Sequence, residues 1–176
     1  PVIGVARSDW TDAAFCEHAH DAIISAIPHA HASTVEPLMK RLDPSHDVAI
    51  VETNRRGHAT RFAQDAATRG LDVVIGFGGD GTLNEVATGI AGTDTALGVL
   101  PGGSTNVFAR TIGLPNDPVA AVKLLVGALA DASSIRPIGL GKVNGRYFCF
   151  HTGVGYDAAV VRTVERRAAL KRWAGH

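Results

Sequence analysis

Apolar runs and helix-spaced repeats alternate along the chain from residue 48 onward. The run VAIVET at 48–53 predicts a buried strand, and apolar residues then recur at the spacing of one helix face over 59–66. Further strands are predicted at 71–77 and 95–101, with another helix-spaced repeat between them over 83–90. Because the strands are continuous apolar runs, both of their faces should be covered. The pattern predicts an α/β fold with a parallel sheet and helices on both faces.

The pattern changes after residue 134. Before it, DPVAAVKLLVGALAD at 117–131 predicts one more helix with an Asp-Pro start. After it, the pair Asn144-Gly145 separates two strand-like stretches, which is a strong hairpin signal because a type I′ turn needs positive φ at both central residues. We therefore expect an α/β domain over 1–133 and the beginning of a truncated β-sandwich domain over 134–176. The basic final segment, DAAVVRTVERRAALKRW at 157–173, is predicted to be a helix.

Charge and cysteine usage narrow the classes of protein. Seventeen basic and seventeen acidic residues cancel, so no global field recruits nucleic acid. Cys16 and Cys149 lack a CxxC spacing, which argues against a disulfide framework or a zinc site. No apolar stretch reaches the roughly 18 residues of a membrane-spanning helix. We expect a cytoplasmic protein whose contact with a membrane, if it makes one, is peripheral.

Residues 1–47 give the least readable pattern. Four of the eight histidines fall there, scattered among alanines and acids. Two histidines without a nearby third ligand are more often surface residues than a metal site. We interpret them as surface residues, namely His18, His20, His29 and His31.

Glycines gather where the predicted strand at 71–77 ends. IGFGGDGTLNEV at 75–86 places them around a single acid, Asp80, so that bare backbone N–H groups and a helix N-terminus can face one anion. Phosphate is the obvious candidate. Asp80 would repel phosphate unless a divalent cation such as magnesium, or its waters, lay between them. An alternative needs no ligand: Asp80 caps a helix in a tight turn, and Thr82 with Glu85 forms a capping box.

A second glycine loop follows the next strand. LPGGSTNVFAR at 100–110 again permits close approach of a ligand and adds hydroxyl and amide groups that can donate hydrogen bonds. Since neighbouring parallel strands end at one edge of the sheet, both loops should converge on the same ligand. Helix N-capping is the alternative role for the polar side chains of this loop. These are Ser104, Thr105 and Asn106.

The pair GGDGTLNE and PGGSTNVFAR closely resembles the diacylglycerol kinase catalytic domain family, lipid kinases that include sphingosine kinases and bacterial relatives. The resemblance extends from about Val48 to the end of the chain. It implies a Rossmann-like α/β domain, as in NAD kinases and diacylglycerol kinases, followed by a β-sandwich domain. It also implies an ATP-dependent and Mg2+-dependent transfer of the γ-phosphoryl group to a hydroxyl of a diacylglycerol-like lipid at the membrane surface. This chain would supply the nucleotide-binding part.

The resemblance further assigns site residues. Asp80 is expected to be catalytic and to organise magnesium, most simply through water. Ser104 stands where the family commonly has threonine, and Val107 departs from the aspartate frequent after that asparagine. The nucleotide contacts that the resemblance implies are Thr53, Gly78, Gly79, Asp80, Gly81, Thr82, Leu83, Asn84, Glu85, Gly102, Gly103, Ser104 and Asn106.

Two departures from the family concern other parts of the chain. The family's first strand ends in an asparagine-proline loop, and the nearest match here, AIISAIPHAHAS, has Ile27 before Pro28. The family's catalytic base and most of its magnesium-linked acids lie in the second domain, beyond residue 176. No residue of this chain inherits those roles.

Three alternatives to a lipid kinase remain from the sequence. An NAD kinase-like enzyme shares the GGDGT loop. A nucleotide-binding fragment without activity of its own would also fit these 176 residues. A dinucleotide-dependent oxidoreductase fits least, because GFGGDG does not give GxGxxG in register. The expected partners are a nucleotide and a lipid substrate, with a homodimer as one option for assembly and no nucleic acid.

Overall fold

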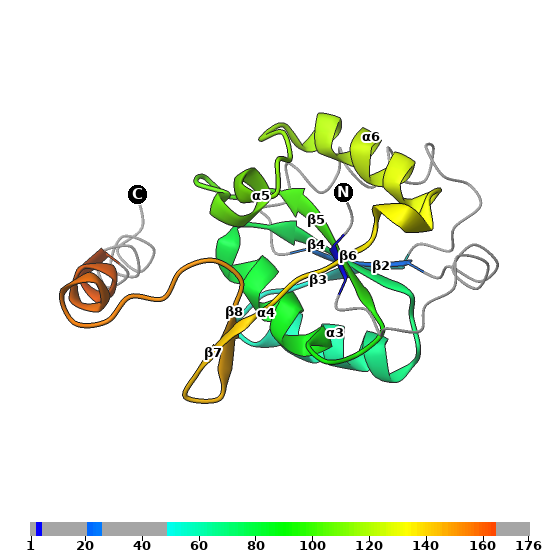
Figure 1. Cartoon of the computed structure of the whole chain (residues 1–176). Coiled ribbons are helices and arrows are strands. Elements are labelled where there is room, and N and C mark those ends of the chain that lie inside the picture. The colour runs from blue at the N-terminus through cyan, green and yellow to red at the C-terminus, as the bar shows by residue number, and fades with distance from the viewer. Residues whose placement is uncertain (1–2, 5–20, 26–48, 165–176) are drawn as a thin grey trace.

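A computed structural model describes residues 3–4, 21–25 and 49–164 (Figure 1). In chain order the elements are β1 (Ile3–Gly4), β2 (Asp21–Ser25), β3 (Ala49–Glu52), α3 (His58–Thr68), β4 (Val73–Gly78), α4 (Asp80–Ile90), β5 (Ala96–Pro101), α5 (Val107–Thr111), α6 (Pro118–Leu129), the 3-10 helix η1 (Ala132–Ser134), β6 (Arg136–Pro137), β7 (Gly141–Val143) and β8 (Arg146–Phe148).

The main sheet has the strand order β3-β2-β4-β5-β1-β6. β3, β2, β4 and β5 run parallel to one another, which confirms the predicted parallel sheet for these four strands. β1 departs from the parallel pattern, because it pairs antiparallel with β5. This strand is two residues long and comes from the least readable part of the chain, so no apolar pattern indicated its direction. An antiparallel strand beside parallel ones is common in mixed sheets.

β2 resolves one question about the N-terminal part. It covers Asp21–Ser25 and so contains the whole AIIS stretch, the place where the family's first strand is expected, and it lies between β3 and β4. The loop after it, including Ile27 and Pro28, lies outside the described residues. So do the histidines for which we expect no metal site.

The core has two halves, one on each face of the sheet. Side chains of a strand alternate between faces, so Val74 packs with α3 and α4 while Ile75 and Phe77 pack with α6. β5 divides in the same way, with Val99 on the first face and Leu100 on the second. Figure 1 shows α3 and α4 on one side of the sheet and α6 on the other. The predicted covering of both faces is confirmed.

The two helices on the first face are in very close contact. A Cβ on Gly89 of α4 would lie 2.6 Å from both the Thr60 carbonyl oxygen and the Ala63 Cβ of α3. The Thr60 hydroxyl also donates to the Glu85 carbonyl oxygen at 3.0 Å. Because α3 follows β3 and α4 follows β4, this contact fixes the loops that begin the two helices relative to each other.

The segment after the sheet begins with the predicted hairpin. β7 and β8 pair antiparallel, and Asn144 and Gly145 between them have φ of 48° and 78°, as the predicted turn requires. Residues 156–164 are helical, which confirms the described part of the predicted final helix. The domain boundary at residue 134 stays a prediction; β6, just after it, pairs with β1 in the main sheet. In the described ranges, no helix has the length and apolar character needed to cross a bilayer.

Candidate functional site

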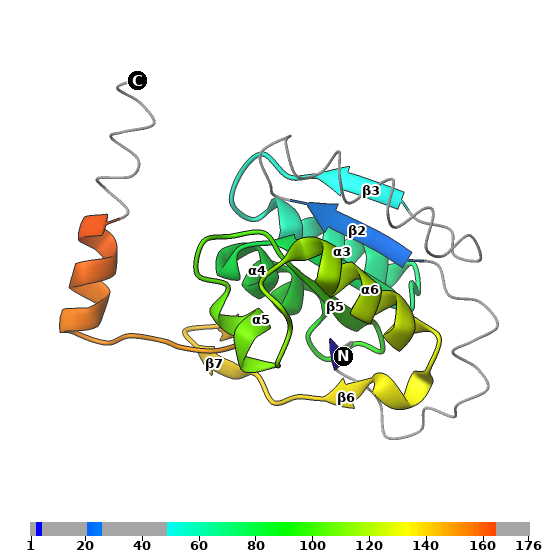
Figure 2. The ribbon, with the colours of Figure 1, turned by 90° about the horizontal axis from the view of Figure 1, so that it is seen from above.

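The glycine loops begin side by side at one edge of the sheet. The last residues of β4 and β5, Gly78 and Pro101, are paired in the parallel register. Seen from above, β2 and β3 point toward the side where α4 and α5 begin (Figure 2). The loop after β3, which holds Thr53, therefore opens on the same side. The predicted convergence of the two glycine loops is confirmed.

Several glycines in these loops are required by close contacts within the protein. The Gly102 N–H donates to the Gly78 carbonyl oxygen at 2.9 Å. A Cβ on Gly103 would lie 2.6 Å from the Gly79 Cα, which is backbone and cannot rotate away. A Cβ on Gly78 would lie 2.7 Å from the Cβ of Thr82. Side chains are thus excluded partly because each loop occupies the space beside the other.

Gly81 differs from its neighbours. It is exposed, and a Cβ there would meet nothing within 4 Å. It lies in the first turn of α4, where backbone N–H groups have no partner within the helix. No contact within the described residues requires a glycine at this position. An anion bound close to the backbone would explain why residue 81 has no side chain.

Asp80 ties the two loops together. Its Oδ1 accepts a hydrogen bond from the backbone N–H of Phe108, in the first turn of α5, at 2.9 Å. Asp80 therefore caps a helix, but the one that follows the other loop. The predicted capping box of Thr82 and Glu85 is wrong, because α4 already begins at Asp80 and Gly79 is its N-cap, with no side-chain cap.

Asn106 holds the second loop in shape. It is 2% exposed and adopts φ of 47°. Its Oδ1 accepts from the Gly103 N–H at 2.8 Å, while its Nδ2 donates to the Gly103 carbonyl oxygen at 2.8 Å and to Asn116 Oδ1 at 2.7 Å. It stands at the N-cap position of α5 but makes no side-chain cap bond to it. The amide closes the loop, and its implied contact with a nucleotide stays a prediction.

The other predicted site residues differ in exposure. Leu83 is fully buried in the core on the α3 and α4 face, so its side chain serves packing. Asn84 is half-buried, and its amide bonds the backbone of Tyr147 and Cys149. Sequence reasoning missed that contact, since 63 residues separate Asn84 from Tyr147. The remaining residues are the half-buried Thr53, Thr82 and Glu85 and the exposed Ser104.

His58, at the start of α3, is a further residue of this edge that the sequence analysis did not select. Arg55 Nε donates to its Nε2, and its Nδ1 is buried with no hydrogen-bond partner among the described residues. The ring lies edge-on to Phe62. The pKa of His58 is lowered by burial first and then by the charges of Arg55 and Arg61, while Glu85 acts in the opposite direction. The imidazole is therefore neutral at pH 7.

Within the described ranges no cluster of three His, Cys, Asp or Glu side chains could hold a metal ion by itself. Magnesium, however, is commonly held by one or two carboxylates together with substrate phosphates and waters, and Asp80 supplies one carboxylate at the glycine loops.

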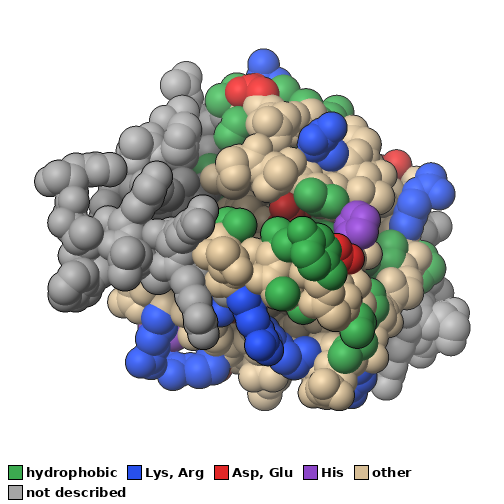
Figure 3. Space-filling view, turned by 90° about the vertical axis from the view of Figure 1, so that its left-hand side faces the viewer, with side chains coloured by type: hydrophobic (Ala, Val, Ile, Leu, Met, Phe, Trp, Pro, Cys, Tyr) green, Lys and Arg blue, Asp and Glu red, His purple; other side chains and the backbone are tan. Residues whose placement is uncertain are grey.

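The face that is turned to the left in Figure 1 carries a group of hydrophobic side chains. Acidic side chains and a histidine lie beside this group, and basic side chains lie around it (Figure 3).

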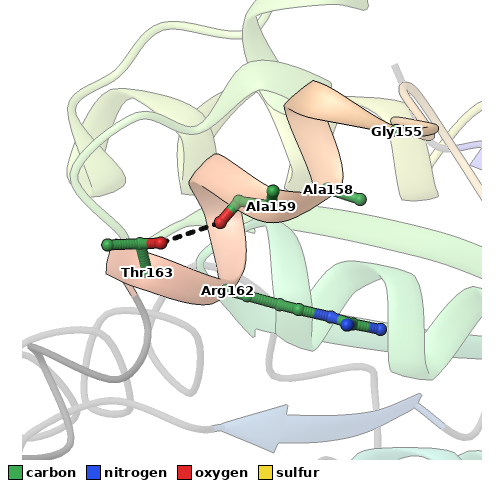
Figure 4. Close-up of a pocket in the computed structure, with 5 residues that line it drawn as sticks. All are labelled: Gly155, Ala158, Ala159, Arg162 and Thr163. Carbon is green, nitrogen blue, oxygen red and sulfur yellow. Dashed lines mark hydrogen bonds between the residues drawn. The ribbon is translucent and has the colours of Figure 1, made fainter.

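A separate pocket lies on the helix at 156–164. It measures about 470 Å³ and is lined by small side chains and by Arg162 (Figure 4). Thr163 Oγ1 donates to the Ala159 carbonyl oxygen at 2.9 Å, so this hydroxyl bonds its own helix. The helix stands apart from the sheet in both views of the ribbon. The pocket therefore does not belong to the strand-end loops.

The comparisons with known proteins identify the family. The family model described as "Diacylglycerol kinase catalytic domain" matches residues 26–143, which include both glycine loops. The chain belongs to this family. It is 40% identical over 121 residues to a diacylglycerol kinase of Bacillus subtilis strain 168, covering 67% of this chain and 38% of that protein. It is 38% identical over 106 residues to the "Probable lipid kinase YegS-like" of Klebsiella pneumoniae strain 342, covering 59% and 34%.

A solved structure gives the same result for the fold. The crystal structure of a diacylglycerol kinase from Bacillus anthracis str. Sterne superposes with a TM-score of 0.63 and 28% identity, covering 75% of this chain and 46% of that one. The chain thus spans less than half the length of the relatives that it matches. The family and the α/β fold that the sequence predicts are confirmed, and the truncated second domain stays a prediction.

Proposed function

We propose that this chain is the nucleotide-binding part of an ATP-dependent lipid kinase, which transfers the γ-phosphoryl group to a hydroxyl of a diacylglycerol-like lipid. Membership of the family supports kinase chemistry. The observation that carries the nucleotide assignment is the pair of glycine loops, held side by side where strands end, with the exposed Gly81 in the first turn of α4. A helix N-terminus with a bare backbone is a ready anion site.

Phosphoryl transfer depends mostly on positioning and charge neutralisation. The N–H groups at the start of α4 would bind phosphate oxygens, and Ser104 would add a hydroxyl. Magnesium, when bound, would neutralise phosphate charge. Asp80 Oδ1 already accepts from Phe108, so Oδ2 would be the oxygen that orients the ion's water shell. The remaining implied nucleotide contacts, from Thr53 to Asn106, belong to this proposal, except Asn84, whose amide is already bonded to the backbone of Tyr147 and Cys149.

The proposal also covers the surroundings of the enzyme. We propose a cytoplasmic protein that meets its lipid substrate at the membrane surface, and we keep homodimerisation as a proposal for its assembly. The domain boundary at residue 134 is likewise proposed, with the hairpin as the first part of a second, β-rich domain.

Calorimetric titration of this chain tests the nucleotide assignment. The ligand is a non-hydrolysable ATP analogue, with and without Mg2+, and NAD is titrated in parallel. Binding of the analogue that Mg2+ strengthens, without binding of NAD, is expected. Binding of NAD alone would favour the NAD kinase-like alternative instead. In a full-length parent, normal turnover by Asp80→Ala would contradict the catalytic role of Asp80.

A further inference from the structure

Asn84 makes a paired contact with the hairpin. Its Nδ2 donates to the Tyr147 carbonyl oxygen at 3.0 Å, and its Oδ1 accepts from the Cys149 N–H at 3.0 Å. Both ends of the amide are therefore bonded to the backbone on either side of Phe148. A residue of a parallel neighbouring strand bonds its partner strand in the same way, to the carbonyl of the preceding residue and the N–H of the following one. The side chain thus takes the place of a strand beside β8.

The hairpin needs such a partner. β7 and β8 form a sheet of only two strands, and a two-stranded hairpin is marginally stable in water unless it packs on something else. The flanks of this hairpin do pack against the core on the α3 and α4 face, through Ile138, Leu140, Cys149 and Phe150. Asn84 supplies the polar part of the same contact by pairing the open edge of β8.

We propose that Asn84 is a positioning residue that fastens the β7–β8 hairpin to α4, rather than a nucleotide contact. α4 begins in the GGDG loop, so the hairpin is held to the helix whose first turn carries the candidate phosphate site. The hairpin and the loop then move as one unit. This inference stands apart from the proposed function, since the contact exists in the protein alone.

Cys149 gives a direct readout of the contact. Its thiol is half-buried, and burial raises its pKa from an ordinary value of 9.0 to about 12, so it should react slowly with a thiol reagent. Cys16 is replaced by serine so that only Cys149 reports. Asn84→Ala in that background removes two hydrogen bonds, which should open the hairpin and speed labelling by about 5- to 150-fold. The pKa of the Cys149 thiol, measured from the ultraviolet absorbance of the thiolate, should fall from about 12 toward 9.0.

Thr88→Ala is the matched control, because Thr88 lies one turn further along α4 and its hydroxyl bonds the Asn84 carbonyl oxygen at 2.7 Å. It should label like the Cys16→Ser parent. Equal labelling of Asn84→Ala and that parent would overturn the proposal. If Asn84→Ala fails to fold by circular dichroism, Asn84→Asp replaces it: the carboxylate still accepts from Cys149 but faces the Tyr147 carbonyl with no donor, and labelling should again rise.

Hydrogen exchange in the unmodified chain provides an independent measurement. The Cys149 amide should exchange far more slowly than that of Asn144 in the exposed turn, because Asn84 Oδ1 accepts from it. Equal exchange of the two amides would also overturn the proposal. No nucleotide enters either measurement, so their outcome is separate from that of the titration with the ATP analogue.

Discussion

Replacing Gly103 by alanine tests whether close approach of the two loops explains their glycines. The new Cβ would lie 2.6 Å from the Gly79 Cα and 3.0 Å from Asn106 Oδ1. Carbon atoms pack at about 3.5 to 4.0 Å, so one loop must move by about 1 Å. That movement also strains the two hydrogen bonds between Gly103 and Asn106. Overpacking of this kind costs about 1 to 3 kcal/mol of stability.

Gly81→Ala is the matched control in the other glycine loop. A Cβ at this position meets nothing within 4 Å, and the residue lies inside α4. Alanine is preferred over glycine in a helix by about 0.5 to 1 kcal/mol, so the chain should become slightly more stable. Affinity for the ATP analogue should nevertheless fall, because the methyl group stands where phosphate is proposed to approach.

Urea unfolding followed by circular dichroism measures both variants. We expect Gly103→Ala to unfold at a lower urea midpoint than the parent, Gly81→Ala at an equal or higher one, and the slope to be unchanged in both. A parent-like midpoint for Gly103→Ala would refute the packing argument. Unchanged affinity of Gly81→Ala would count against the phosphate site while leaving the packing argument intact.

Three further predictions concern polar groups of the same edge. Asp80→Ala should lose about 1.5 to 3 kcal/mol of stability with its bond to Phe108, whereas Asp80→Asn keeps an acceptor and should lose less; equal unfolding midpoints for the two would contradict this. Asn106→Ala leaves the Gly103 N–H without its acceptor and should cost about 1 to 3 kcal/mol in the same assay, so an unchanged midpoint would disprove its structural role. Because the pKa of His58 is lowered in the folded chain, the unfolded chain binds a proton more readily, and the free energy of unfolding should fall as the pH drops below 6.5. His58→Phe should show a smaller fall in that free energy between pH 7.5 and 5.5 than the parent.

The sequence predicted those parts of the fold whose pattern is local. β4, α4 and β5 each carry an apolar run or repeat that specifies the element and its buried face. The direction of β1 could not be predicted, because a strand of two residues carries no periodicity and its pairing depends on where the chain returns to the sheet.

The site was predicted in its location but not in its internal contacts. Strand-end glycines indicate a loop that something approaches closely, and two such loops after neighbouring strands must converge. Local spacing does not reveal that Asp80 bonds a residue 28 positions away, or that Asn84 bonds one 63 positions away. Those partners are set by the packing of α4 against α5 and the hairpin, which no single segment encodes.

The bond from Gly102 to Gly78 and the bond from Phe108 to Asp80 have a kinetic consequence. These two hydrogen bonds order both loops during folding, so a ligand that binds does not have to immobilise them. Immobilising a flexible side chain on binding commonly costs about 0.5 to 1.5 kcal/mol. Association should then be a single step whose observed rate rises linearly with ligand concentration, without the plateau that a slow rearrangement imposes.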